Sequence, residues 1–164
     1  MNKMLLTKQK YSTSCGIACI AMLAGKSHHS VMRVAIDLFK WENSPRYLEN
    51  HSRTNCDEIK TLLKAFNVSR QGDFIPIDLA PDKQVSFWKK LKGINLVAVR
   101  FNKETKRWHW VIVVQTKSGV KIYDPEKKKN PKVKNVVYVN FSKTEHPNFT
   151  RFGRAKYYLR IKGC

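Results

Sequence analysis

The chain has 164 residues, 42% of them hydrophobic, which is enough for one folded domain with its own core and excludes a disordered basic tail. Lysine and arginine number 32 and aspartate and glutamate 12, so the formal net charge is +20 at pH 7. This charge favours nucleic acid, an anionic membrane surface or an acidic protein as a partner, without distinguishing among them.

The sequence gives no indication of a membrane span, a secretory signal or a metal site. Its longest apolar run, Ile17 to Ala24, falls well short of the ~20 residues that a spanning helix needs. Residues 1–9 lack the apolar segment of a signal peptide, so we expect a cytoplasmic protein or one delivered into the cytosol of a target cell. Four cysteines fit neither a disulfide framework nor zinc-ligand spacing, which predicts reduced thiols with no metal or cofactor: Cys15, Cys19, Cys56 and Cys164.

Helical periodicity predicts four helices in the first part of the chain, over residues 15–25, 29–40, the stretch that follows residue 55, and about 82–92. Ser14 is the expected N-cap of the first helix, and Gly25 is expected to end it. The third helix is expected to begin after Thr54 or Asn55, which cap it. Residues 41–54 are predicted to be irregular.

The pattern then changes to strands, which are expected at Asn95–Phe101, Trp108–Gln115, Val120–Tyr123, Val133–Phe141 and Lys156–Ile161. Helices followed by an antiparallel sheet are typical of the α+β class. We therefore expect a single domain over residues 1–164, with a helical part at about 1–93 packed on an antiparallel sheet at about 94–164.

Cys15 stands at the start of the first predicted helix, where unpaired N–H groups and the helix dipole favour a thiolate. Taken alone, its position favours a small buried helix residue. A nucleophilic cysteine also needs a base, a group that orients the base, and oxyanion donors. His109 opens a Val/Ile strand and is the candidate base, and Asp124 at the end of the next strand is the candidate orienting group. The amide of Gln9 and the backbone N–H of Cys15 are the candidate oxyanion donors.

The hairpin between the two strands decides whether His109 and Asp124 can meet. If Lys117 and Ser118 form a two-residue loop, Val111 lies opposite Asp124, and His109 is two residues along the same face. A four-residue loop would place His109 directly opposite Asp124. A three-residue loop without a bulge would separate the two side chains, so the loop length is a test of the interpretation.

Three segments, "QKYSTSCGIACIAMLAGK", "HWVIVV" and "IYDP", resemble the papain-like cysteine peptidases of the bacteriocin-processing type, also called double-glycine peptidase-like. Domains of that family carry a Gln-x5-Cys-Gly start, a His-(Trp/Tyr)-Val-Val-Val strand and an Asp-Pro ending. The resemblance covers roughly residues 7–125. It implies a papain-like fold with Cys15 as nucleophile, His109 as base, Asp124 as orienting residue and Gln9 as oxyanion donor.

The sequence departs from that family at Ser14, where an aspartate is usual, and in its far more basic end. The resemblance implies that Cys19 occupies a small, buried position on the same helix.

The resulting expectation is a cysteine hydrolase that cleaves either a peptide bond or a side-chain amide, as a glutamine deamidase does. Size and charge also suit a bacterial toxin or effector domain with an acidic immunity partner. The alternative is a nucleic-acid-binding or RNA-cleaving module that uses the lysine-rich loop 125–135 and the end "RFGRAKYYLRIKGC", where aromatic residues alternate with cations. A third reading is a catalytically inactive binding domain.

Overall fold

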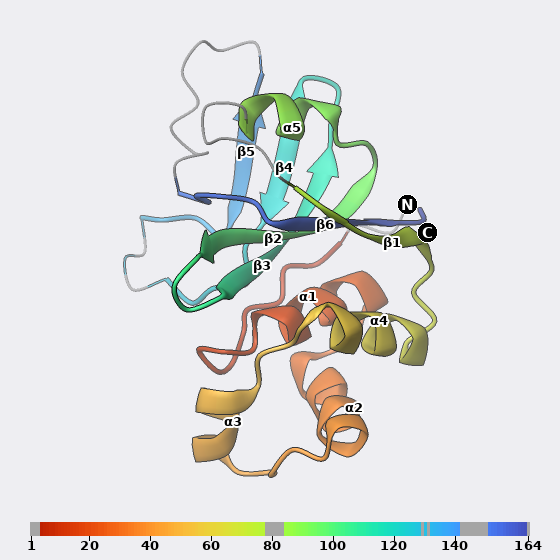
Figure 1. The fold of residues 1–164 in the computed structure, drawn as a ribbon, viewed down its shortest axis with the longest axis vertical. Coiled ribbons are helices and arrows are strands. Elements are labelled where there is room, and N and C mark those ends of the chain that lie inside the picture. Colours follow the sequence, from red (N-terminus) through yellow and green to blue (C-terminus); the bar gives the residue numbers. More distant parts are fainter. Residues whose placement is uncertain (1–3, 78–83, 129, 131, 142–150, 164) are drawn as a thin grey trace. The chain divides into compact units, whose positions relative to one another are not determined.

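The computed structural model describes residues 4–77, 84–128, 130, 132–141 and 151–163. Five α-helices and six β-strands occur in these ranges (Figure 1). They form two compact units. The helical unit comprises the chain up to Ser69 together with Pro125–Asn135, and the sheet unit comprises Arg70–Asp124 and Val136–Gly163. The sheet unit thus begins earlier than residue 94, where the sequence pattern changes to strands.

The helical unit is built around α1 (Cys15–Ala24), which packs against α2 (His28–Phe39) and α4 (Cys56–Ala65). Every residue of α1 from Cys15 to Met22 is buried, so this helix is apolar all round, as a central helix must be. Cys19 has no exposed surface, which confirms it as a core residue. None of the helices in the described ranges is long and apolar enough to cross a membrane.

Local signals fix the ends of these helices. Gly25 ends α1 in the left-handed conformation, with φ of 63°, and its N–H donates to the carbonyl of Ala21. Asn55 begins α4 in a capping box with Glu58, each side chain accepting from the other residue's backbone N–H. Both helix ends were expected from the sequence, because caps depend on residues close together in the chain.

Residues 41–54 are not wholly irregular, and that prediction is wrong. They contain α3 (Pro45–His51), whose first turn is capped by the hydroxyl of Ser44 and opened by Pro45. The Ser-Pro pair was an available start signal. The helix has only seven residues and buries only Leu48 among its described side chains, so it leaves no clear apolar periodicity in the sequence.

The sheet unit is one antiparallel sheet with the strand order β1-β6-β2-β3-β4-β5. Five strands lie where the sequence predicts them: β2 (Ile94–Asn102), β3 (Arg107–Gln115), β4 (Gly119–Tyr123), β5 (Val136–Asn140) and β6 (Tyr157–Ile161). The sixth, β1 (Arg70–Pro76), was not predicted. It is an edge strand with mostly exposed residues and an irregular register against β6, so it carries no alternating pattern.

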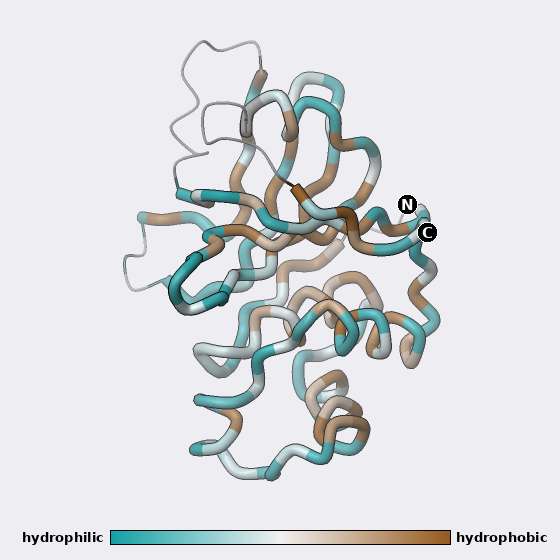
Figure 2. The backbone as a smooth tube through the Cα atoms, in the orientation of Figure 1, coloured by the Kyte–Doolittle hydropathy of each residue, from teal (hydrophilic) through white to brown (hydrophobic). Residues whose placement is uncertain are grey.

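One face of the sheet is covered by α5 (Gln84–Lys90), within the region where a short helix was expected. Phe87 and Trp88 of this helix join a buried cluster with side chains of four strands, including Val97, Val111 and Ile122. The hydropathy-coloured tube shows apolar stretches in the sheet that alternate with hydrophilic positions (Figure 2). Trp110, Val111, Ile112 and Val113 follow one another in β3 and are all buried, so both faces of this strand are enclosed.

The hairpin between β3 and β4 has the two-residue version of the predicted loop. Gln115 pairs with Val120, and the N–H of Thr116 donates to the carbonyl of Gly119 at 2.9 Å. Lys117 and Ser118 are therefore the loop residues. This register determines which residues face each other at the other end of the two strands, where His109 and Asp124 lie.

Candidate functional site

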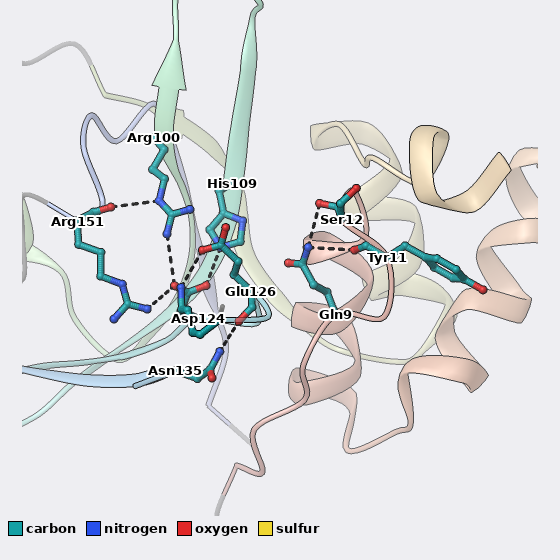
Figure 3. A network of polar contacts seen from close by, with 10 residues as sticks. Gln9, Tyr11, Ser12, Arg100, His109, Asp124, Glu126, Asn135 and Arg151 are labelled. Atoms are coloured by element: carbon teal, nitrogen blue, oxygen red, sulfur yellow. Dashed lines mark hydrogen bonds and ion pairs between the residues drawn. The ribbon is translucent and has the colours of Figure 1, made fainter. Parts of the chain in front are cut away.

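His109 and Asp124 form a close pair in the sheet unit (Figure 3). His109 Nε2 lies 2.7 Å from Asp124 Oδ1, and the Asp124 side chain has no exposed surface. The pairing follows from the β3–β4 register, in which Ile112 faces Tyr123 and the next step brings Val111 opposite Asp124. His109 then points to the same face two residues along, within diagonal reach. The expected geometry of the two side chains is thus confirmed.

The bond through Nε2 determines which ring nitrogen of His109 is available for proton transfer. A carboxylate accepts hydrogen bonds, so Nε2 carries a proton toward Asp124. The second nitrogen, Nδ1, is then the position where a proton is taken up or delivered. This is the arrangement in which an acidic group orients a histidine base.

Two arginines contact the same carboxylate at its other oxygen. A guanidinium nitrogen of Arg151 lies 2.7 Å from Asp124 Oδ2, and one of Arg100 lies 3.5 Å from it. These cations come from β2 and from the segment before β6, and neither was predicted from the sequence to have this role. Two positive charges on Oδ2 stabilise the buried carboxylate as an anion and disfavour a metal cation beside it.

Cys15 is the first residue of α1 and is only 6% exposed. Ser14 precedes it, as expected, but the serine side chain makes no capping bond to α1. The hydroxyl of Ser14 instead donates to the carbonyl of Tyr11 at 3.0 Å and accepts from the N–H of Tyr11 at 3.1 Å. The first turn of α1 also contains no acidic residue, so neither a serine cap nor a carboxylate there competes with a thiolate for the helix dipole.

Gln9 is 4% exposed and holds the loop that leads to Cys15 (Figure 3). Its Nε2 donates to the carbonyls of Tyr11 and Ser12, at 3.0 and 2.9 Å. Both partners are acceptors, so the amide must present its nitrogen to them. The backbone N–H of Gln9 donates to the carbonyl of Pro125 at 2.8 Å, which fixes the start of this loop within the helical unit. The Gln9 side chain thus stabilises the loop before Cys15, and its role as an oxyanion donor stays a prediction.

The loop before Cys15 is held by three further contacts that the sequence did not indicate. The hydroxyl of Thr13 donates to the carbonyl of Leu48, within α3, at 2.9 Å and accepts from the N–H of Ser52, which follows α3, at 3.1 Å. His28 Nε2 lies 3.0 Å from the hydroxyl of Ser14. These partners lie 14 to 39 residues apart in the chain, and no local pattern reveals them.

His28 was given no role from its sequence context, and the structure makes it part of the loop that precedes Cys15. Burial lowers the pKa of His28 from its ordinary 6.5 to about 4, with further lowering by the positive charges of Lys10, His29 and Lys127. The ring is therefore neutral near pH 7, and its Nε2 accepts from the N–H of Lys10 at 3.5 Å.

The aromatic residues near the chain end, which suggested base stacking, are packed inside the sheet unit. Phe152 has no exposed surface and belongs to the buried cluster on the α5 face, and Tyr158 packs against that cluster. The ring of Tyr157 meets that of Trp108 edge to face at 5.7 Å between centroids. Core packing therefore accounts for these three aromatics without a nucleic acid.

Comparison with known proteins finds similarity in structure but not in sequence. Neither a family model nor a curated protein matches the sequence. Among solved structures, the crystal structure of the Pseudomonas avirulence protein AvrPphB matches with a TM-score of 0.53 at 10% sequence identity, over 98% of both chains. The chain has a papain-like α+β fold. The bacteriocin-processing branch suggested by the sequence motifs is not supported by this match, which concerns the fold alone.

Proposed function

We propose that the protein is a papain-like cysteine hydrolase in which Cys15 is the nucleophile, His109 the base and Asp124 the orienting residue. The observation that carries the proposal is the 2.7 Å contact between His109 Nε2 and Asp124 Oδ1. A buried Asp–His pair at the end of a Val/Ile strand has little structural benefit, because an apolar pair would fill the space without desolvating a charge. The papain-like fold and the placement of Cys15 at the start of α1 support the assignment.

In the proposed reaction, His109 Nδ1 takes the thiol proton of Cys15 and the thiolate attacks the substrate carbonyl carbon. A C–S bond forms, and negative charge develops on the carbonyl oxygen, toward which the backbone N–H of Cys15 donates. The amide of Gln9 donates there too once it releases one of the two loop carbonyls, Tyr11 or Ser12, that occupy its N–H groups. The C–N bond then breaks, and the amine leaves with the proton from His109. Water, deprotonated by His109, attacks the thioester, and the C–S bond breaks to restore the thiol.

We infer that the substrate is a protein or peptide, cleaved at a peptide bond or at a glutamine side-chain amide, since both need the same groups. The structural neighbour is an avirulence protein, which favours a bacterial effector acting in the cytosol of a target cell. A charge of +20 favours an acidic partner, either the substrate or an immunity protein.

Site-resolved alkylation with iodoacetamide near pH 6, read by peptide mass spectrometry, tests the catalytic pair. An ordinary thiol has a pKa near 8.5 and reacts slowly at that pH. We expect Cys15 to react about tenfold or more faster than Cys56, which is partly exposed and serves as the internal reference. His109→Ala should abolish this advantage and leave the Cys56 rate unchanged. Equal rates at both cysteines in the wild type would refute the proposal.

A second experiment separates the two reactions. Target-cell lysate is incubated with the wild type and with Cys15→Ala, and the proteins are compared by mass spectrometry. New peptide termini that depend on Cys15 indicate a peptidase, whereas conversion of glutamine to glutamate indicates a deamidase.

A further inference from the structure

We propose that Arg151 and Arg100 are positioning residues of the His109–Asp124 pair, holding Oδ2 of the carboxylate so that Oδ1 is presented to the histidine. The proposal rests on the function proposed above. Its geometry lies wholly within the sheet unit, where all four side chains are described (Figure 3).

The two oxygens of Asp124 are divided between different partners. Oδ1 accepts from His109 at 2.7 Å, and Oδ2 faces Arg151 at 2.7 Å and Arg100 at 3.5 Å. A carboxylate with both oxygens engaged cannot rotate about its Cβ–Cγ bond without breaking contacts on both sides. The arginines therefore fix the direction from which Asp124 approaches the imidazole.

Arg100 lies in a β-bulge of β2, which determines its position. Val99 of β2 pairs with His109, the next pair is Asn102 with Arg107, and the register shifts between them. Arg100 lies in this bulge with φ of 52°, a left-handed conformation that is unfavourable for a residue other than glycine. The bulge turns the arginine side chain toward the end of β4, where Asp124 stands. Strain retained beside a candidate catalytic pair indicates a positional requirement.

The second arginine, Arg151, belongs to a segment that is hydrogen-bonded to the same bulge. The N–H of Arg100 donates to the carbonyl of Phe152 at 2.8 Å, and its Nε donates to the carbonyl of Arg151 at 3.1 Å. Gly153 sits so close to the bulge that a Cβ there would lie 3.4 Å from Cα of Arg100. Arg100 thus contacts the carboxylate and also anchors the main chain that carries Arg151.

The two guanidinium groups should also lower the pKa of His109. A cation near an imidazole disfavours the protonated ring, whereas the carboxylate favours it. Arg100 from β2 and Arg151 from the segment before β6 both contact the carboxylate of Asp124. Glu126, two residues after Asp124, adds a negative charge, with a carboxylate oxygen within 4.8 Å of the ligand atoms of His109 and Asp124. Removing one of these positive charges should therefore raise the pKa of His109 and shift the pH profile of Cys15 reactivity upward.

The test is an NMR titration of the His109 ring in the wild type, Arg151→Gln, Arg151→Lys and Arg160→Gln, together with the pH profile of Cys15 alkylation. Arg160 lies in β6 and pairs with Asn95, so its variant removes one positive charge from the same sheet as a matched control. We expect Arg151→Gln to raise the His109 pKa by about 0.5–1 unit, Arg151→Lys to restore most of the wild-type value, and Arg160→Gln to have no effect. The apparent pKa for Cys15 alkylation should move with that of His109.

An unchanged His109 pKa in Arg151→Gln, with only a lower melting temperature, would show a merely structural ion pair and overturn the proposal. An equal shift in Arg160→Gln would overturn it too, since the effect would then be one of net charge. If Arg151→Gln does not fold, Arg100→Met and Arg151→Lys supply the same comparison. The titration does not use Cys15. A wild type without selective Cys15 reactivity therefore refutes the proposed function, while the titration still decides whether the arginines position the pair.

Discussion

His109 and Asp124 meet at 2.7 Å because β3 and β4 are joined by a two-residue loop that sets their register. The contact lies at the end of the same sheet face that α5 covers, so a rigid core supports it on one side. A side-chain pair carried by paired strands is held more precisely than one carried by loops.

The charge of Asp124 should matter for stability as well as for chemistry. Asp124→Asn leaves two guanidinium groups beside a neutral amide in a buried position, so we expect a loss of about 2–4 kcal/mol in the free energy of unfolding. Chemical denaturation of the wild type and the variant measures this difference in the free energy of unfolding. Asp57→Asn is the matched control, because Asp57 is 89% exposed in its ion pair with Lys60 and should cost less than about 1 kcal/mol. Equal losses in the two variants would contradict the expectation.

The sequence predicted those parts of the fold that depend on neighbouring residues. The ends of α1 and α4 follow from Gly25 and Asn55, and the His109–Asp124 contact follows from strand alternation with a short loop. These features are specified within about 15 residues of chain, so a pattern can reveal them.

What the sequence could not reveal depends on contacts between distant segments. Strand β1 is held at the sheet edge by β6, about 85 residues later, and has no apolar alternation of its own. Arg151 reaches Asp124 across 27 residues, and a lysine-rich and arginine-rich chain gives no reason to select that one cation. Residues 78–83, which include the start of the predicted helix at 82–92, lie outside the described residues.

His28 should make the stability of the protein depend on pH. Its pKa is about 4 in the folded protein and 6.5 ordinarily, so between these values the unfolded chain binds the extra proton and the folded one does not. Stability should be fully present above pH 6.5 and should fall by roughly 1–2 kcal/mol as the pH is lowered toward 4. Urea denaturation at several pH values measures this. His28→Gln keeps an acceptor near Nε2 but does not titrate, so its stability should depend less steeply on pH, whereas the variant His51→Gln, at an exposed histidine that does not act on His28, should keep the wild-type dependence.

Gly119 should tolerate no side chain. It opens β4 opposite Asn140, and a Cβ at this position would lie 1.7 Å from the backbone carbonyl oxygen of Val139. A backbone atom cannot move aside cheaply, so Gly119→Ala should destabilise the protein by about 2–4 kcal/mol. Gly163→Ala is the control, because nothing lies within 4 Å of its added Cβ. A wild-type melting temperature for Gly119→Ala would show that the β4–β5 register differs from the one described.

The bulge at Arg100 separates the energetic effect of backbone strain from that of the guanidinium. Arg100→Ala and Arg100→Gly both remove the contact with Asp124, but only glycine adopts a φ of 52° without strain. We therefore expect Arg100→Gly to be more stable than Arg100→Ala by about 1 kcal/mol, although both should be less stable than the wild type. Thermal denaturation of the two variants side by side gives the difference. Because the guanidinium is missing from both, equal stability would mean that the bulge relaxes when the side chain is lost. Arg100 would then hold its left-handed conformation only because its contacts with Asp124 and Arg151 stabilise it.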